Sequence, residues 1–220
     1  KNKYQEDIFD LIIESELRDT LEFKYSDLPF YFIKYWIEDK YQEGLDVLAD
    51  KRIFRKLNLK KTMFNPYQKI SIDNVVPSEK DEFFRYGKLQ GYVHDEGAAM
   101  LGGVSGHAGL FSNSYEVALI LQTFLQGGIY DGIRLFDKKS FDLFNYCYYC
   151  DKGNRSGAGF DKPQLEGKHG STFGGVSKKS FGIFIFYKFL ILMLSNKNLK
   201  KQFLRSKIFK IHFSQFFFEK

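Results

Sequence analysis

The stretch GYVHDEGAAMLGGVSGHAGLFS (residues 91–112) gathers six of the nineteen glycines of the chain, two histidines and an Asp-Glu pair. Glycine permits positive φ angles and allows the backbone to approach another surface closely. The stretch ends just before a helical pattern, because Asn113 and Glu116 have the spacing of a capping box. Such a loop can form the rim of a pocket, or it can be a tight crossover that needs glycine only for packing. The residues alone leave both interpretations open.

The residues of this stretch can be compared with three kinds of ligand site. It lacks the Lys-Ser/Thr pair of a phosphate-binding loop, and it follows no clear strand, as a dinucleotide-binding fingerprint would. His94, Asp95 and His107 carry imidazole and carboxylate groups that suit a metal ion. Their spacing matches no helix-borne pair such as His-Glu-x-x-His, and polar loop residues are the simpler interpretation. We therefore predict no metal, and keep a metal-dependent hydrolase built on these three residues as an alternative.

Apolar periodicity predicts helices on both sides of this stretch. Asp27 is expected to cap the second of them, with Pro29 in its first turn and Gly44 at its end. The expected helices cover residues 5–17, the segment between Asp27 and Gly44, residues 45–57, the segment between Asn113 and Gly127, and a segment from Asp137 to Cys150. Residues 62–90 are expected to be a long surface excursion. Because helices come first and strand-like residues last, the pattern predicts an α+β fold.

The net charge of +6 does not indicate nucleic-acid binding, because it is concentrated at one end of the chain. Residues 178–220 carry ten Lys or Arg and one acidic residue, whereas residues 1–177 have a net charge of −3. Cys147 and Cys150 form a single Cys-x-x-Cys, and no second pair completes a zinc site. Two ordinary thiols are therefore favoured over a redox pair. The apolar run 183–194 is too short to cross a bilayer as a helix and suits a buried strand.

Three segments together resemble one enzyme superfamily. They are YSDLPFY (25–31), RYGKLQGYVHDEGAAMLGGVSGHAGLFSNSYEVALILQTFLQGG (85–128) and SGAGFDKP (156–163). In order and spacing they resemble the serine β-lactamases and penicillin-binding-protein-like hydrolases, and most of all the branch fused behind a family 3 glycoside hydrolase in Bacteroidetes-type bacteria. The resemblance implies that the glycine-rich stretch borders the active-site cleft. The residues that it places on this cleft loop are His94, Asp95, Gly106, His107 and Gly109.

The chemistry of that superfamily uses three motifs. Ser-x-x-Lys supplies a nucleophile and the lysine that accepts its proton. Tyr-x-Asn supplies a second proton-transfer group and an amide, and Lys/His-Thr/Ser-Gly supplies substrate contacts and one edge of the oxyanion hole. The resemblance makes Tyr25 the proton-transfer residue of the second motif and puts Asp27 where Asn is usual. Because a carboxylate cannot donate an amide hydrogen bond, this departure disfavours β-lactam-type recognition and leaves ester and peptide substrates open.

The other two motifs are missing from the chain. None of its serines is followed by lysine three residues later, and the resemblance implies that this motif would precede Lys1. KKSFG (178–182) stands where a following His-Thr-Gly is expected, but residues 183–220 contain no Gly, Ala, Val, Pro, Thr or Asp. Such a composition provides no turn residues. It resembles translation of an A/T-rich gene outside its frame, or an internal deletion.

We therefore expect an incomplete α+β fold of the β-lactamase and transpeptidase type in residues 1–182, with part of an antiparallel sheet, and an aberrant tail in residues 183–220. The expected reaction is acyl transfer to serine and hydrolysis of a cell-wall peptide, β-lactam or ester, without a cofactor and without activity in this chain alone. A non-catalytic module that binds cell-wall material for a glycoside hydrolase is the alternative. The implied partners are the substrate and a fused upstream glycoside hydrolase, not nucleic acid. Membrane contact through the basic tail is less favoured, and the family is usually exported to the periplasm or cell envelope.

Overall fold

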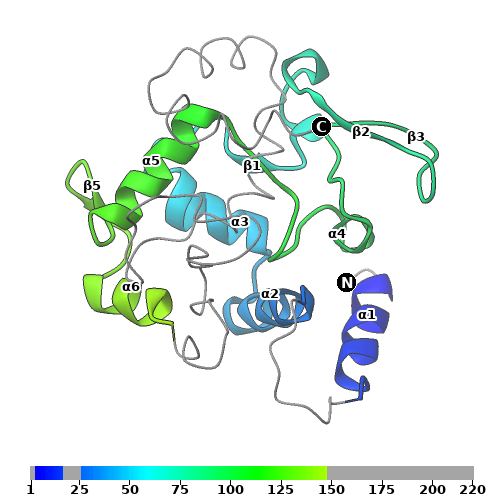
Figure 1. Cartoon of the computed structure of the whole chain (residues 1–220), viewed down its shortest axis with the longest axis horizontal. Helices are drawn as coiled ribbons and strands as arrows, with labels where there is room; N and C mark the ends of the chain where they lie inside the picture. The colour runs from blue at the N-terminus through cyan, green and yellow to red at the C-terminus, as the bar shows by residue number, and fades with distance from the viewer. Residues whose placement is uncertain (1–2, 17–25, 148–220) are drawn as a thin grey trace, which may run out of the picture. The chain divides into compact units, whose positions relative to one another are not determined.

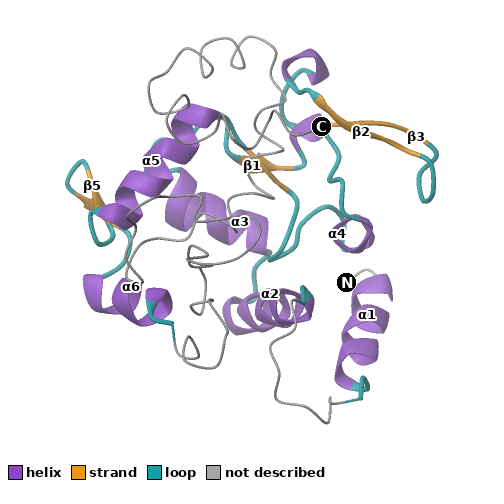
Figure 2. Cartoon of the chain, in the orientation of Figure 1, coloured by secondary structure: helices purple, strands orange, loops and turns teal. Residues whose placement is uncertain are grey.

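The computed structural model describes residues 3–16 and 26–147, and its helices and short antiparallel sheets confirm the predicted α+β class (Figures 1 and 2). The chain divides into two compact units, Lys1–Ser112 and Asn113–Lys220. The predicted boundary between residues 182 and 183 lies outside the described residues and stays a prediction.

Two helices and a helical turn open the first unit, and they follow the predicted order. They are α1 (Lys3–Ile13), α2 (Leu28–Tyr41) and α3 (Leu45–Ala49), the last continuing into the π-helical turn η1 (Asp50–Phe54). Pro29 stands in the first turn of α2, where its missing N–H costs no hydrogen bond. The predicted stop at Gly44 was wrong. Gln42 ends α2 in the left-handed region, with φ of 50°, and Gly44 is the N-cap of α3.

The junction between α2 and α3 is held by one carboxylate that accepts two hydrogen bonds. Glu38 Oε2 pairs with Lys34 Nζ at 2.6 Å, and its Oε1 accepts a hydrogen bond at 2.9 Å from the backbone N–H of Leu45. The residue Lys34 is buried, so its ammonium group needs this partner. The pair therefore fixes how α3 follows α2.

Residues 62–90 are not the surface excursion that the sequence suggested. They contain β1 (Met63–Phe64), the 3₁₀ turns η2 (Pro66–Gln68) and η3 (Ile72–Asn74), β2 (Pro77–Asp81) and β3 (Gly87–Gln90). β2 and β3 pair antiparallel and form the long hairpin of Figure 2. The side chains of Phe64, Val75 and Leu89 are buried in the core. Pro66 opens a turn and Pro77 opens a strand, so the prolines of this segment do not mark one continuous surface loop.

Asp81 organises the turn of that hairpin. Its carboxylate accepts hydrogen bonds from the backbone N–H groups of Phe83, Phe84 and Arg85 at 2.9–3.1 Å, and from Arg85 Nε at 2.8 Å. The Phe84 N–H and the Arg85 guanidinium hold the pKa of Asp81 well below its usual range. Arg85 then reaches the carbonyl oxygens of Val93 and His94, each at 2.5 Å. The hairpin is thereby tied to the start of the glycine-rich stretch.

The glycine-rich stretch itself folds into a short helix, a loop and a strand. Asp95 caps α4 (Glu96–Met100), and β4 (Leu110–Phe111) pairs antiparallel with β1. Gly109 has a φ of 104° and its Cα lies against Gly103, so a Cβ here would meet the Gly103 carbonyl oxygen at 2.3 Å. Only glycine fits this turn into the strand.

The second unit contains α5 (Ser114–Leu125), β5 (Ile129–Tyr130), β6 (Ile133–Arg134) and α6 (Lys138–Asn145). Both predicted caps are confirmed: Asn113 Oδ1 accepts from the N–H of Glu116 at 2.9 Å, and Asp137 Oδ1 accepts from the N–H of Ser140 at 2.6 Å. Gly127 follows α5 in the left-handed region, as expected. The last helix was predicted too long, since α6 ends at Asn145 and not at Cys150.

Across the described ranges, 3–16 and 26–147, the helices are all too short or too polar to cross a membrane. The apolar run 183–194 and the basic tail lie outside those ranges, so the predictions about them stay predictions.

Candidate functional site

The start of α2 meets the glycine-rich stretch, and three potential ligand groups converge there. One carboxylate oxygen of Asp27, one of Asp95 and one ring nitrogen of His107 all lie within 4.8 Å of one another. We refer to Asp27, Asp95 and His107 as the Asp-Asp-His cluster. It joins residues that are 68 and 80 positions apart in the sequence. Local spacing does not show this convergence.

Asp27 stands at the N-cap of α2, but its side chain does not cap the helix. Its backbone is helical, with φ of −84° and ψ of −15°, and the N–H of Leu28 is instead hydrogen-bonded to Ser26 Oγ at 3.2 Å. The predicted N-cap position is confirmed and the predicted capping hydrogen bond was wrong. An Asp at this position usually accepts from the second or third N–H of its helix. Here the carboxylate lies in the Asp-Asp-His cluster.

Asp95 serves two purposes at the start of α4. Its Oδ1 accepts a hydrogen bond from the backbone N–H of Ala98 at 2.7 Å, which caps the helix. The same oxygen lies 2.8 Å from Nε2 of His107. The carboxylate is therefore held in place by local helix geometry and then holds the imidazole.

The ring of His107 is fixed from three directions. Its Nε2 faces Asp95, and its Nδ1 lies 3.0 Å from Ser105 Oγ. The ring of Tyr31 stacks on the imidazole with centroids 4.4 Å apart. The His107 side chain is only 2% exposed. A neutral imidazole has one donor and one acceptor nitrogen, so this geometry satisfies both of its ring nitrogens.

Glycine allows the loop to lie directly against α2. A Cβ on Gly106 would come within 2.5 Å of the backbone carbonyl oxygen of Phe30, and a Cβ on Gly97 would collide with the hydroxyl of Tyr31. Both contacts require the absence of a side chain. Close packing is thus one reason for glycine in this stretch. Its predicted place at the border of an active-site cleft stays a prediction.

His94 is separated from the predicted metal ligands. Its Nδ1 pairs with Glu79 Oε1 at 2.6 Å on the β2–β3 hairpin, and its carbonyl oxygen accepts from Arg85. The set of His94, Asp95 and His107 is therefore not the group that the structure brings together, since Asp27 takes the place of His94. Tyr25, the other residue predicted for the second motif, lies outside the described residues.

Two residues of this site were missed by the sequence analysis. Tyr31 lies one helical turn after Asp27, which puts both on the same face of α2. Ser105 precedes His107 by two residues and is buried, and in the sequence it is only one of the serines that have no lysine three residues later. The i, i+4 spacing of Asp27 and Tyr31 was the signal that could have found the first of them.

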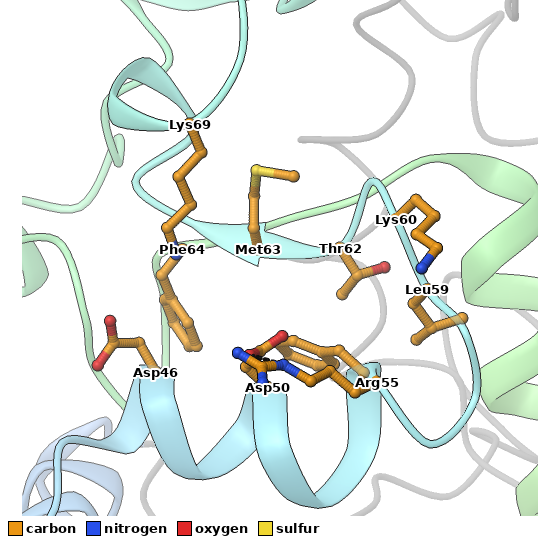
Figure 3. A pocket seen from close by; sticks show the side chains of 10 residues that line it. Asp46, Asp50, Arg55, Leu59, Lys60, Thr62, Met63, Phe64 and Lys69 are labelled. Atoms are coloured by element: carbon orange, nitrogen blue, oxygen red, sulfur yellow. Dashed lines mark ion pairs between the residues drawn. The ribbon is translucent and has the colours of Figure 1, made fainter.

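A separate hollow of about 650 Å³ opens beside α3, η1 and β1 (Figure 3). Asp50 and Arg55 form an ion pair at 2.6 Å on its wall, and Lys60 and Lys69 line it. Its lining includes none of the predicted site residues and no member of the Asp-Asp-His cluster. The hollow therefore gives no support to the predicted catalytic residues.

Comparisons with known proteins give relatives for about half of the chain. An N-acetylmuramyl-L-alanine amidase of Bacillus subtilis (strain 168) is 37% identical over 132 residues, which is 54% of this chain and 30% of the relative. The protein named "Putative D-alanyl-D-alanine carboxypeptidase" of Escherichia coli (strain K12) is 34% identical with the same coverage. A protein of that name from Salmonella agona (strain SL483) is 35% identical.

No family model matches the chain, and no solved structure matches it. The chain spans less than a third of the length of the curated relatives named above. Their names point to a family of cell-wall hydrolases.

Proposed function

We propose that this chain is part of a serine hydrolase that cleaves cell-wall peptides by acyl transfer. One observation supports the proposal: two of the segments that resemble the serine hydrolase superfamily lie together in the structure. Asp27 of YSDLPFY lies beside Asp95 and His107 of the glycine-rich stretch. These segments are far apart in sequence, and the resemblance implies that both border one cleft. The relatives' names support a cell-wall substrate, since an amidase and carboxypeptidases cleave amide bonds.

The proposed reaction has two steps, and this chain supplies only part of its machinery. A serine hydroxyl attacks the peptide carbonyl carbon, the neighbouring lysine takes the hydroxyl proton, and the leaving amine takes a proton through Tyr25. Water then attacks the acyl-enzyme ester, which releases the carboxylic acid and restores the serine. No Ser-x-x-Lys occurs in the 220 residues. We place that motif upstream in a longer protein.

Asp27 gives the proposed site a preference among substrates. Where Asn would donate its amide N–H, an ionised carboxylate only accepts hydrogen bonds. A peptide substrate offers backbone N–H donors to such a group, whereas the four-membered ring of a β-lactam has no N–H of its own. The proposed substrate is therefore a peptide or ester rather than a β-lactam.

A cell-wall substrate also sets the proposed location. We place the longer protein in the periplasm or cell envelope, because peptidoglycan is assembled outside the cytoplasmic membrane. We also propose that a glycoside hydrolase domain precedes this region in the longer protein. This proposal is supported by the resemblance of the chain to the branch that is fused to such a domain.

The test uses the longer gene product with its upstream region, beside the 220-residue chain. The longer protein should release D-alanine from a peptide ending in D-Ala-D-Ala, and a trapped acyl-enzyme should map by mass spectrometry to a serine upstream of Lys1. The 220-residue chain should give neither product nor adduct, because removing the nucleophile alone removes most of the chemistry. An adduct on the 220-residue chain, or an active longer protein with no modified serine, would contradict the proposal.

The role of Tyr25 has a matched control. Tyr25→Phe in the longer protein should lower kcat/KM by about 10²–10⁴, the usual contribution of a positioned acid or base. Tyr86→Phe makes the same chemical change at an exposed position in the β2–β3 turn and should leave kcat/KM unchanged. Equal activities in the two variants would remove Tyr25 from the mechanism.

A further inference from the structure

The turn between β2 and β3 presents three aromatic side chains to solvent, Phe83, Phe84 and Tyr86. We call these three residues the aromatic tip. The exposed fraction is 87% for Phe83, 45% for Phe84 and 78% for Tyr86. The turn lies at the far end of the long hairpin in Figure 2. Single exposed apolar residues are ordinary, but a cluster of large ones indicates an interaction surface.

The backbone of this turn is held in one conformation. The buried carboxylate of Asp81 accepts hydrogen bonds from the N–H groups of Phe83, Phe84 and Arg85 at 2.9–3.1 Å. Tyr86 follows with a φ of 51°, in the left-handed region that bulky residues rarely adopt. Such a backbone angle costs free energy and is typical of functional sites. A fixed and costly backbone conformation therefore holds the aromatic tip in water.

The same hydrogen bonds make the turn suitable for contact with a surface that excludes water. An N–H group without a partner is costly beside hydrocarbon. In this turn the N–H groups of three successive residues are already paired with Asp81, and the charge of Asp81 is paired with Arg85 Nε at 2.8 Å. Only the aromatic side chains would have to leave water, and transfer of apolar surface out of water is favourable.

Two lysines beside the turn give it a positive charge. Lys80 of β2 and Lys88 of β3 stand directly opposite each other in the hairpin, and both are exposed. Like charges at opposite positions of a sheet destabilise it. Lys80 Nζ is paired with Glu82 at 2.6 Å, but Lys88 has no ion-pair partner among the residues that the structure describes. An anionic surface would complement this charge.

We propose that the aromatic tip docks on the anionic phospholipid surface of a membrane. Phe83 and Phe84 enter the boundary between headgroups and acyl chains, and Tyr86 lies at the level of the headgroups. Lys80 and Lys88 face the lipid phosphates. A projecting turn fits a deformable lipid surface, whereas a protein partner would need a groove shaped to receive it. The contact is separate from the acyl transfer proposed above and does not depend on it.

The experiment measures co-sedimentation of the 220-residue chain with two kinds of vesicle. One kind is phosphatidylcholine alone, and the other is phosphatidylcholine mixed with phosphatidylglycerol. The chain should bind the mixed vesicles at least about tenfold more tightly, and added salt should weaken this binding. Absence of binding to the mixed vesicles, or equal binding to both kinds, would overturn the proposal.

A pair of double variants separates the aromatic tip from the basic segment 178–220, which both variants retain. Phe83→Ser with Tyr86→Ser should weaken binding to the mixed vesicles at least about tenfold, because two apolar side chains no longer leave water. The control, Phe144→Ser with Tyr115→Ser, makes the same changes at exposed positions of α6 and α5 and should bind like the parent. Equal affinities of the two double variants would assign the binding to another part of the chain and refute the proposal.

A fluorescence measurement locates the contact without weakening it. Trp36 is the single tryptophan of the chain, so Trp36→Phe with Phe83→Trp leaves one tryptophan, at the aromatic tip. Its emission should shift to shorter wavelength on the mixed vesicles and should be quenched by brominated lipid. The control, Trp36→Phe with Tyr115→Trp, should show neither change. An unshifted emission from position 83 on vesicle-bound protein would refute the proposal.

The charge of the surface has its own matched pair of variants. Lys88→Gln should weaken binding to the mixed vesicles about fivefold, the usual effect of one lysine beside an anionic membrane. Lys56→Gln removes the same charge at an exposed position outside the hairpin and should bind like the parent. Equal weakening by the two changes would show attraction by net charge alone and would contradict the proposed contact.

Discussion

Replacement of Gly106 by alanine tests the packing of the glycine-rich loop against α2. A Cβ added to Gly106 would lie 2.5 Å from the backbone carbonyl oxygen of Phe30 and 3.2 Å from its carbonyl carbon. The first distance is about 0.9 Å short of the 3.4 Å at which ordinary contacts begin. Because the obstructing atoms belong to the backbone of a helix, no side-chain rotation can relieve the contact.

The size of the effect follows from two opposing contributions. Overpacking of a fitted contact costs about 1–3 kcal/mol. Alanine also restricts the unfolded chain, which offsets roughly 0.4–1 kcal/mol of that cost. The φ angle of Gly106 lies outside the left-handed region, so no backbone strain adds to the balance. We expect Gly106→Ala to lower the free energy of unfolding by about 1–2 kcal/mol.

The assay is urea unfolding followed by circular dichroism, with Gly87→Ala as the matched control. A Cβ on Gly87 would meet its nearest atom, the Arg85 carbonyl oxygen, at 3.8 Å, which is an ordinary contact. Gly87→Ala should therefore be neutral or slightly stabilising. The Gly106→Ala midpoint should fall, while the slope of free energy against urea stays the same. If both variants unfold at the parent midpoint, the close approach of Gly106 to Phe30 is wrong.

Two further predictions concern stability. The pKa of Asp81 in the folded state is lowered from 3.8. The contribution of its carboxylate to the free energy of unfolding is therefore present above about pH 4 and is lost as the pH falls below that value. Asp81→Asn should lower the urea midpoint near neutral pH, and a difference from the parent that does not shrink in acid would contradict the assignment. Asn113→Ala should destabilise α5 by about 1 kcal/mol, and Asn113→Asp should restore it, because either oxygen can accept from the N–H of Glu116. Equal Tm values for parent and Asn113→Ala would show that the cap contributes nothing.

The sequence determined the features that depend on neighbouring residues. The N-caps at Asn113 and Asp137 each accept from an N–H three residues later, so the donor and acceptor are specified by local spacing. Pro29 was placed in the first turn of α2 for the same reason. The predicted α+β class is also confirmed, but the described strands lie between the helices, and the strand-like residues 183–194 on which the prediction relied lie outside the described residues.

Element ends were less well determined, because several residues can end a helix. Gly44 was the expected stop of α2, but Gln42 adopts the left-handed conformation two residues earlier. Residues 62–90 were expected at the surface because of their prolines and charges. Asp81 is nevertheless buried, since three backbone N–H groups and Arg85 compensate for its lost hydration. Such compensation depends on the fold of the turn and is not visible in composition.

Only the tertiary structure decided which distant groups meet. The sequence assigned Asp27 to one motif and Asp95 and His107 to another, and it grouped His94 with the latter two. The fold instead ties His94 to the β2–β3 hairpin and brings Asp27 to Asp95 and His107. Pairing of β1 with β4 likewise joins segments 46 or more residues apart. Contacts of this range depend on how helices, turns and strands pack together, which local patterns of side chains do not specify.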